Sequence, residues 1–216
     1  LMSNMDIKKL AGYCLILGPI LALVCFFIQP GGVLGIGGSA EPLDFAGQIQ
    51  IAVDNSMLGI LTAMLIPVGL ISLFSGIFYY VRSMEGGNGH AISSLSTPFF
   101  LSAIIGWSIA NGIWVGIASE IIKNAEIIGI TYGINIVSSM SFGFGGIFLA
   151  LGASTRNEVK QIITYIAAIA AAAVMITSFL LAFSPDSGNT IAQLNGLCFM
   201  IYTLWSIMLG RSLATK

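Results

Sequence analysis

The sequence predicts an all-α, polytopic integral membrane protein, and three observations lead to this fold class. Of the 216 residues, 56% are hydrophobic and only 8% are charged, whereas an ordinary soluble domain carries about 25% charged residues. The apolar stretches run for about 20 residues or more, the length of a helix that crosses a bilayer. The basic residues fall between these stretches or at their ends, and none lies in the middle of one. Because lipid offers the backbone no hydrogen-bond partner, the stretches are expected to be helices packed in a bundle.

Six transmembrane helices are predicted within a single domain that covers residues 1–216. Their expected ranges are 7–28, 57–81, 98–120, 127–153, 159–183 and 191–209. A further, amphipathic helix is predicted at 43–53, because Leu43, Ala46, Ile49 and Val53 share one helical face. Such a helix lies at the membrane surface. It would act either as an anchor or cap, or as a lid over a substrate path or a docking face for a partner.

Local signals predict where three of these helices begin. Thr97 precedes Pro98, a pair that suits a capping residue followed by the first helical position. Thr155 with Glu158, and Thr190 with Gln193, have the spacing of a capping box. The third, fifth and sixth spans are therefore expected to begin just after these threonines.

The positions of lysine and arginine predict the orientation of the chain in the membrane. In the six-span topology, Lys123 falls on one side and the other seven basic residues fall on the opposite side. Those seven are Lys8, Lys9, Arg82, Arg156, Lys160, Arg211 and Lys216. Since cytoplasmic loops carry an excess of lysine and arginine, both termini are expected to be cytoplasmic.

The candidate functional residues lie in the third and fourth spans. Trp107, Asn111 and Trp114 share one face of the third span, and Asn135 and Ser138 lie along a stripe of the fourth. An unpaired amide in the middle of a membrane is costly, so both asparagines are expected to face the bundle interior. They would either hydrogen-bond across the helical hairpin and stabilise packing, or contact a polar solute between tryptophan walls.

Small residues in the same two spans predict close helix packing. Ser108, Gly112 and Gly116 recur at every fourth position of the third span, and Gly129 and Gly133 do so in the fourth. Such stripes let a second helix approach closely in a membrane. A neighbouring helix is therefore expected to cross at these positions.

The groups that are missing from the spans exclude several function classes. No span contains a histidine, none has a lysine or a carboxylate in its middle, and the three cysteines are isolated from one another in the sequence. Acid–base catalysis and metal or haem ligation need such groups, so neither an enzyme nor a metal site nor a cofactor is expected. The near-neutral charge of −1 speaks against nucleic acid as a partner. A lipid or pigment held through asparagines, tryptophans or backbone carbonyls stays open.

The first span resembles the start of small, uncharacterised six-span prokaryotic membrane proteins. The resemblance rests on Lys9-Leu10-Ala11-Gly12, on Gly18-Pro19 and on Gln29-Pro30-Gly31-Gly32. It implies a six-span architecture and a location in a prokaryotic cytoplasmic membrane. Those proteins have no assigned activity, so the resemblance implies none.

Two function hypotheses remain. The first is a non-catalytic accessory or scaffold subunit, whose partners are the lipid bilayer and other membrane proteins or further copies of itself. Smooth apolar helices, many small residues and the lack of intramembrane charge favour it. The alternative is a permease for a small solute, which would act as an oligomer and use the Asn111 and Asn135 cluster.

Overall fold

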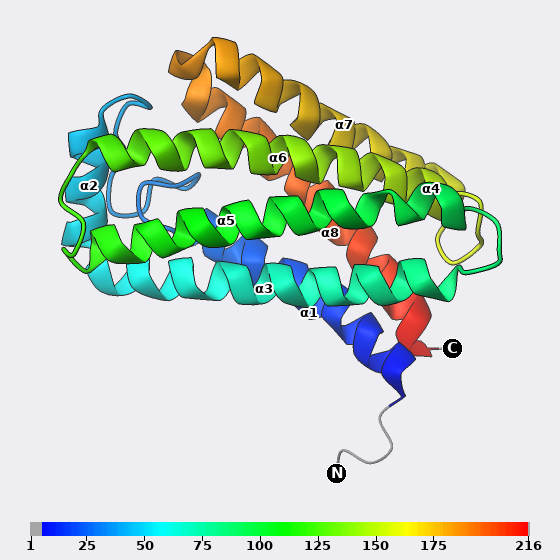
Figure 1. Cartoon of the computed structure of the whole chain (residues 1–216). Coiled ribbons are helices and arrows are strands. Elements are labelled where there is room, and N and C mark those ends of the chain that lie inside the picture. The colour runs from blue at the N-terminus through cyan, green and yellow to red at the C-terminus, as the bar shows by residue number, and fades with distance from the viewer. Residues whose placement is uncertain (1–5, 216) are drawn as a thin grey trace.

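The computed structural model describes residues 6–215 and shows an all-α helical bundle (Figure 1). The six long helices are α1 (Ile7–Ile28), α3 (Ser56–Ser83), α5 (Ser96–Ala118), α6 (Glu126–Ala153), α7 (Gln161–Phe183) and α8 (Gly188–Thr215). The shorter elements are α2 (Phe45–Asp54), α4 (His90–Ser94) and a 3-10 turn at Pro185–Ser187. Each long helix is long and apolar enough to cross a membrane. The predicted fold class, a six-span helical membrane bundle, is therefore confirmed.

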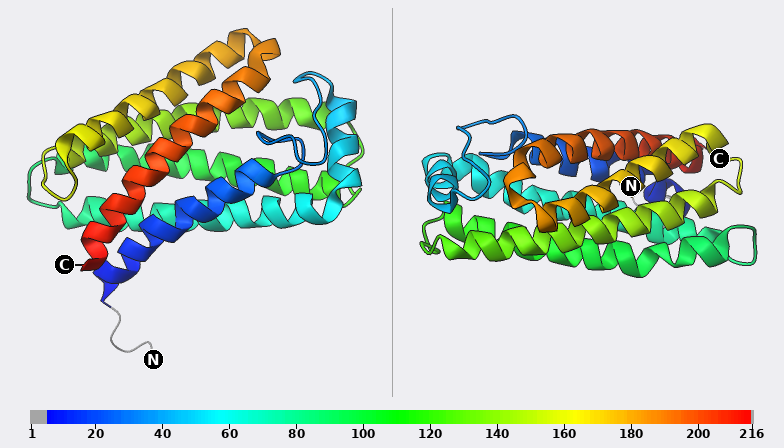
Figure 2. Two further views of the ribbon diagram at one scale, coloured as in Figure 1. Left: turned by 180° about the vertical axis from the view of Figure 1, so that it is seen from behind. Right: turned by 90° about the horizontal axis from the view of Figure 1, so that it is seen from above.

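The long helices form a closed ring in the order of the chain. Each one packs against the next, and α8 returns to pack against α1. Figures 1 and 2 show α3, α5 and α6 side by side, with α1 and α8 crossing behind them at an angle. We call the end of the bundle that carries α2 the α2 end. The opposite end, which we call the α4 end, carries α4 together with Asp6 and Thr215.

The outward faces of the long helices are suited to lipid. Every one of them carries large aliphatic side chains that are more than half exposed. One from each helix in turn is Leu17, Val68, Ile109, Val137, Ile169 and Leu204. An apolar surface of this extent on all sides would drive association in water, and a bilayer covers it without cost. The chain is thus an integral, multi-pass membrane protein.

The closest helix crossings involve glycines of α1. A Cβ atom built on Gly69 of α3 would lie 2.6 Å from the Gly18 carbonyl oxygen of α1. One built on Gly12 of α1 would lie 2.6 Å from the Gly210 carbonyl oxygen of α8. Both distances are too short for any side chain. These glycines therefore allow α1 to pack directly against the backbones of its two neighbours.

The glycines that the sequence singled out for packing lie elsewhere. Gly112 and Gly133 are exposed, and a Cβ on either would meet nothing within 4 Å from the rest of residues 6–215. Gly116 faces Ile122, which follows the same helix, and Gly129 faces the ring of Phe45 in α2. Ser108, on the same stripe, is half-buried. Among residues 6–215, no long helix crosses at these positions, because the ring order places their faces outward, against α2 or against the segment after α5.

The helix starts differ from the predicted ones in three places. α5 begins at Ser96 and α8 at Gly188, so Thr97 and Thr190 lie inside their helices and cap neither. α7 begins only at Gln161, and no side chain caps it. Glu158 does not cap because it binds Arg156 instead. The prediction of three threonine caps was therefore wrong.

The amphipathic helix forms at the expected place. It starts where the Asp44 carboxylate accepts a hydrogen bond from the Gly47 amide at 3.0 Å, which satisfies one of the free amides of the first turn. α2 packs against α3, α5 and α6. It lies across the end of these helices (Figure 1).

Candidate functional site

The ring of long helices encloses a cavity of about 270 Å³. All six helices contribute to its wall, which runs from Phe26 and Gly188 near the α2 end to Phe142 and Tyr202 deeper in the bundle. Beyond Phe142 and Tyr202, toward the α4 end, large buried side chains fill the interior of the ring. They include Leu15, Ile77, Tyr80, Leu149, Trp205 and Leu209. The cavity therefore occupies only the half of the bundle nearer α2.

Aromatic side chains form the floor of this cavity. The ring of Phe142 packs against those of Phe199 and Tyr202, with centroids 5.3 and 5.0 Å away. It also packs against Trp107 at 5.6 Å and Phe100 at 5.4 Å. We call these five residues the aromatic floor. It separates the cavity from the α4 end, so the cavity does not continue through the bundle.

Asn111 lies in the wall of the cavity and is 7% exposed. Its side-chain amide donates a hydrogen bond to the Trp107 carbonyl oxygen, one turn earlier in α5, at 2.8 Å. Its Oδ1 atom is buried and accepts no hydrogen bond from residues 6–215. A buried acceptor without a donor costs about 1–3 kcal/mol. A molecule that brings a donor to this part of the wall would therefore be stabilised there.

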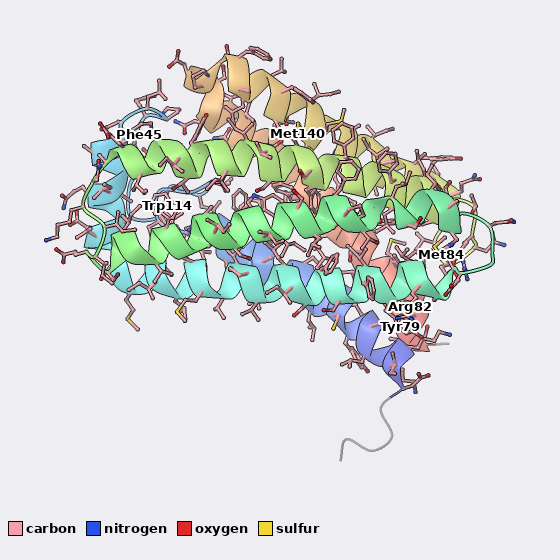
Figure 3. The ribbon with its side chains drawn as sticks, in the orientation of Figure 1. Phe45, Tyr79, Arg82, Met84, Trp114 and Met140 are labelled. Atoms are coloured by element: carbon pink, nitrogen blue, oxygen red, sulfur yellow. The ribbon has the colours of Figure 1, made fainter. Side chains whose placement is uncertain are left out.

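Asn135 of α6 lines the same cavity and is half-buried. Its side chain forms no hydrogen bond within the described part of the chain, and the Asn111 amide donates to Trp107 instead, so the first alternative, a bond between Asn111 and Asn135, does not form. Trp107 and Trp114 also line the cavity, and Figure 3 shows Trp114 toward the α2 end. Ser138 does not line it, because its hydroxyl donates to the Ile134 carbonyl at 2.8 Å and its side chain packs against α5.

Polar residues of α7 and α8 complete the site, and the sequence argument did not include them. Asn195 lies in the wall, and its Oδ1 accepts a hydrogen bond from the Thr177 hydroxyl at 2.6 Å. The Tyr202 hydroxyl is buried and forms no hydrogen bond within residues 6–215. Ser178 also lines the wall. The signal that could have identified these residues in the sequence is a polar side chain within an otherwise apolar span.

The connection between α1 and α2 lies next to the mouth of the cavity. A Cβ on Gly188, the first residue of α8, would lie 3.0 Å from the Cβ of Pro42. The Tyr132 hydroxyl of α6 donates to the Pro185 carbonyl oxygen at 3.2 Å, which ties α6 to the turn before α8. The cavity mouth is therefore framed by two connecting segments, and Gln48 of α2 holds the first of them by donating to the Pro42 carbonyl oxygen at 2.9 Å.

The chemistry of the cavity wall is neutral. Of the residues that line it, none in the described part of the chain is charged, and its polar groups are amides, hydroxyls and indoles. Most of the wall is aliphatic or aromatic. No group of three histidine, cysteine or acidic side chains within residues 6–215 is placed to hold a metal ion. This wall suits an uncharged molecule with a small hydrogen-bonding group.

Comparisons with known proteins identify no relative of this chain. The chain matches no protein-family model, no curated protein sequence and no solved structure.

Proposed function

We propose that this chain is a permease for a small neutral solute, which binds in the cavity between the six helices. The observation that carries the proposal is the neutral, partly polar cavity to which every long helix contributes. The buried Asn111 oxygen that accepts no hydrogen bond and the Asn135 side chain in the same wall offer hydrogen bonds to the solute. No charged group is needed, since uncoupled passage of a neutral solute moves no charge across the bilayer.

Transport would require the aromatic floor to open. The solute enters from the α2 end, where the cavity lies, and passes to the α4 end only when the floor opens. Phe142 is the central ring of the floor, because it contacts the other four rings. The floor thus acts as the closed gate of the permease.

Replacing Asn135 by leucine is expected to lower solute flux about tenfold, the equivalent of about 1.4 kcal/mol, since one hydrogen bond to the solute is lost. The measurement is stopped-flow light scattering of proteoliposomes exposed to gradients of glycerol and of urea. Val137→Leu is the matched control, because Val137 lies on the same helix but faces lipid. Wild-type flux no greater than that of empty liposomes would contradict the proposal.

The second candidate is an accessory subunit that packs beside other membrane proteins. The exposed glycines Gly112 of α5 and Gly133 of α6 favour it, since both lie on outward faces with free space above them. Small residues of this kind let a helix of another protein approach closely. The flux experiment distinguishes the two functions, because a folded subunit without transport activity leaves the flux at the level of empty liposomes.

We further propose that the α4 end faces the cytoplasm. Lys8, Arg82 and Arg156 all lie at this end, whereas Lys123 follows α5 at the α2 end; Lys216 lies outside the described residues. Lysine and arginine mark the cytoplasmic side of membrane proteins. The resemblance of the first span favours a prokaryotic cytoplasmic membrane as the location.

Reporter fusions test this orientation. A fluorescent protein fused after Lys216 is expected to fluoresce, because it folds in the cytoplasm. Alkaline phosphatase inserted within residues 35–38, at the α2 end, is expected to be active, because it requires the opposite side. Reporter activities that place both positions on one side of the membrane would refute the six-span orientation.

A further inference from the structure

A second hollow, of about 360 Å³, lies at the α4 end and differs in character from the cavity. It forms where α1, α3, α8 and the connection between α6 and α7 meet. Its lining is mostly polar and consists of Lys8, Tyr79, Ser83, Arg156, Glu158, Ser212 and Leu213. Figure 3 shows Tyr79 at this end of α3. We propose that this hollow binds a phosphate group, either in the headgroup of an anionic lipid or in a small phosphate ester.

The charges of the lining favour an anion. Lys8 and Arg156 are cationic, and Glu158 is the single carboxylate among the lining residues. Arg156 donates from Nε to the Glu158 Oε1 atom at 2.8 Å, and no other ion pair forms within residues 6–215. A guanidinium group has five N–H donors in a planar fork, so this bond leaves its two terminal nitrogens for another partner. Lys8 has no carboxylate within 4 Å in the described part of the chain.

The connection that carries Arg156 is held against the bundle. The Thr155 hydroxyl donates to the Gly152 carbonyl at 2.8 Å, and the Arg156 amide donates to the Ala153 carbonyl at 3.0 Å. Val159 is buried in the main core. Arg156 is therefore already positioned before a ligand arrives, so ordering it costs less conformational entropy than ordering a free surface arginine.

Glu158 positions the arginine further. Its side chain is only 12% exposed although it is charged, and its sole ionic partner within residues 6–215 is Arg156. A carboxylate bound to Nε restrains the plane of the guanidinium group. The terminal nitrogens can then bind two oxygens of one phosphate, the geometry that makes arginine a phosphate ligand.

Neutral hydrogen-bond donors in the hollow, and its position at the ends of the helices, also favour a phosphate ligand. The Tyr79 and Ser212 hydroxyls line the hollow and can donate to phosphate oxygens. The hollow lies at the ends of transmembrane helices, which is where a bilayer has its headgroup region. Basic pockets between helices at this depth bind anionic headgroups. The proposal does not depend on permease activity, because the two sites lie in opposite halves of the bundle.

Binding to the full-length chain in nanodiscs tests the site. The probe is phosphatidylglycerol, titrated against a background of phosphatidylcholine and followed by native mass spectrometry. Lys8→Gln and Arg156→Gln are each expected to weaken phosphatidylglycerol binding about tenfold, since each removes one charge-assisted contact. Lys9→Gln and Arg82→Gln are the matched controls, because they remove the same charges from exposed positions that do not line the hollow.

Three outcomes decide the proposal. Equal losses in the test and control variants would overturn it, because they indicate a diffuse electrostatic effect. A loss in Lys8→Gln no greater than that in Lys9→Gln would also overturn it, because Lys8 then makes no specific contact with the headgroup. Selective loss in Lys8→Gln supports it even if Arg156→Gln fails to fold. Competition by soluble glycerol phosphate then identifies a free phosphate ester as the source, and its failure to compete identifies the lipid.

Discussion

Replacing Gly69 by leucine is expected to abolish the folded bundle. A Cβ at this position would lie 2.6 Å from the Gly18 carbonyl oxygen and 2.7 Å from the Ala22 amide nitrogen. Both are backbone atoms of α1, so they cannot move aside as a flexible side chain does. Overpacking usually costs about 1–3 kcal/mol and occasionally more. We expect this crossing to exceed that range, because a leucine would collide with backbone atoms of α1 and force the two helices apart. The measurement is thermal unfolding of the detergent-solubilised chain, followed by size-exclusion chromatography.

Two further variants make this result interpretable. Gly69→Ala should give an intermediate loss, because a methyl group already meets the α1 backbone. Gly112→Leu is the matched control and should leave the melting temperature unchanged, because a side chain there enters open space on the outside of the bundle. Equal stability of Gly69→Leu and the wild type would show that α1 and α3 are not packed as described.

Phe142→Ala is expected to have the second largest effect, with two separate consequences. Removing the central ring of the aromatic floor should lower the free energy of unfolding by about 3–5 kcal/mol, the usual cost of truncating a buried phenylalanine to alanine. It also removes the contact shared by the other four rings, so the cavity would extend toward the α4 end. If the chain is a permease, the flux of glycerol through proteoliposomes should therefore rise.

Phe179→Ala is the matched control, because it removes a phenylalanine ring that does not belong to the aromatic floor. Phe179 belongs to α7 and is 47% exposed on the outside of the bundle. Its truncation should change neither stability by more than about 0.5 kcal/mol nor flux. A Phe142→Ala variant that folds with wild-type stability would contradict the role of Phe142 in the floor, and unchanged flux would contradict the gate.

The cavity and the hollow differ in chemistry, and they lie toward opposite ends of the molecule. The hollow at the α4 end has ionic side chains at the membrane surface, where water and headgroups screen and solvate them. The cavity near the α2 end has only neutral groups, because a charge at that depth in the membrane is costly without a partner. A neutral solute in one site and an anionic headgroup in the other are compatible with this division.

The six-span fold followed from composition and helix length. Lipid forces every backbone amide and carbonyl in a span to bond within its own helix, so an apolar stretch of sufficient length has only one conformation available. The same local reasoning placed α2, because Asp44 and the apolar face from Leu43 to Val53 are features of neighbouring residues. Asn111 and Asn135 line the same cavity, and the sequence argument had only grouped them on the hairpin that the third and fourth spans form.

Contacts between distant helices were decided only by the tertiary structure. Gly112 and Gly69 are indistinguishable in sequence, yet one faces outward and the other meets the backbone of α1. Which face turns inward depends on the order of the ring and on the crossing of α1 and α8, and residue spacing contains neither. Likewise, Thr155 and Glu158 have the spacing of a capping box, but in the bundle Glu158 pairs with Arg156, and both line the hollow together with Lys8. Sequence thus determined which segments are helices in a membrane, because that depends on local polarity. The assembled bundle determined which small and polar side chains meet, because that depends on surfaces brought together from far along the chain.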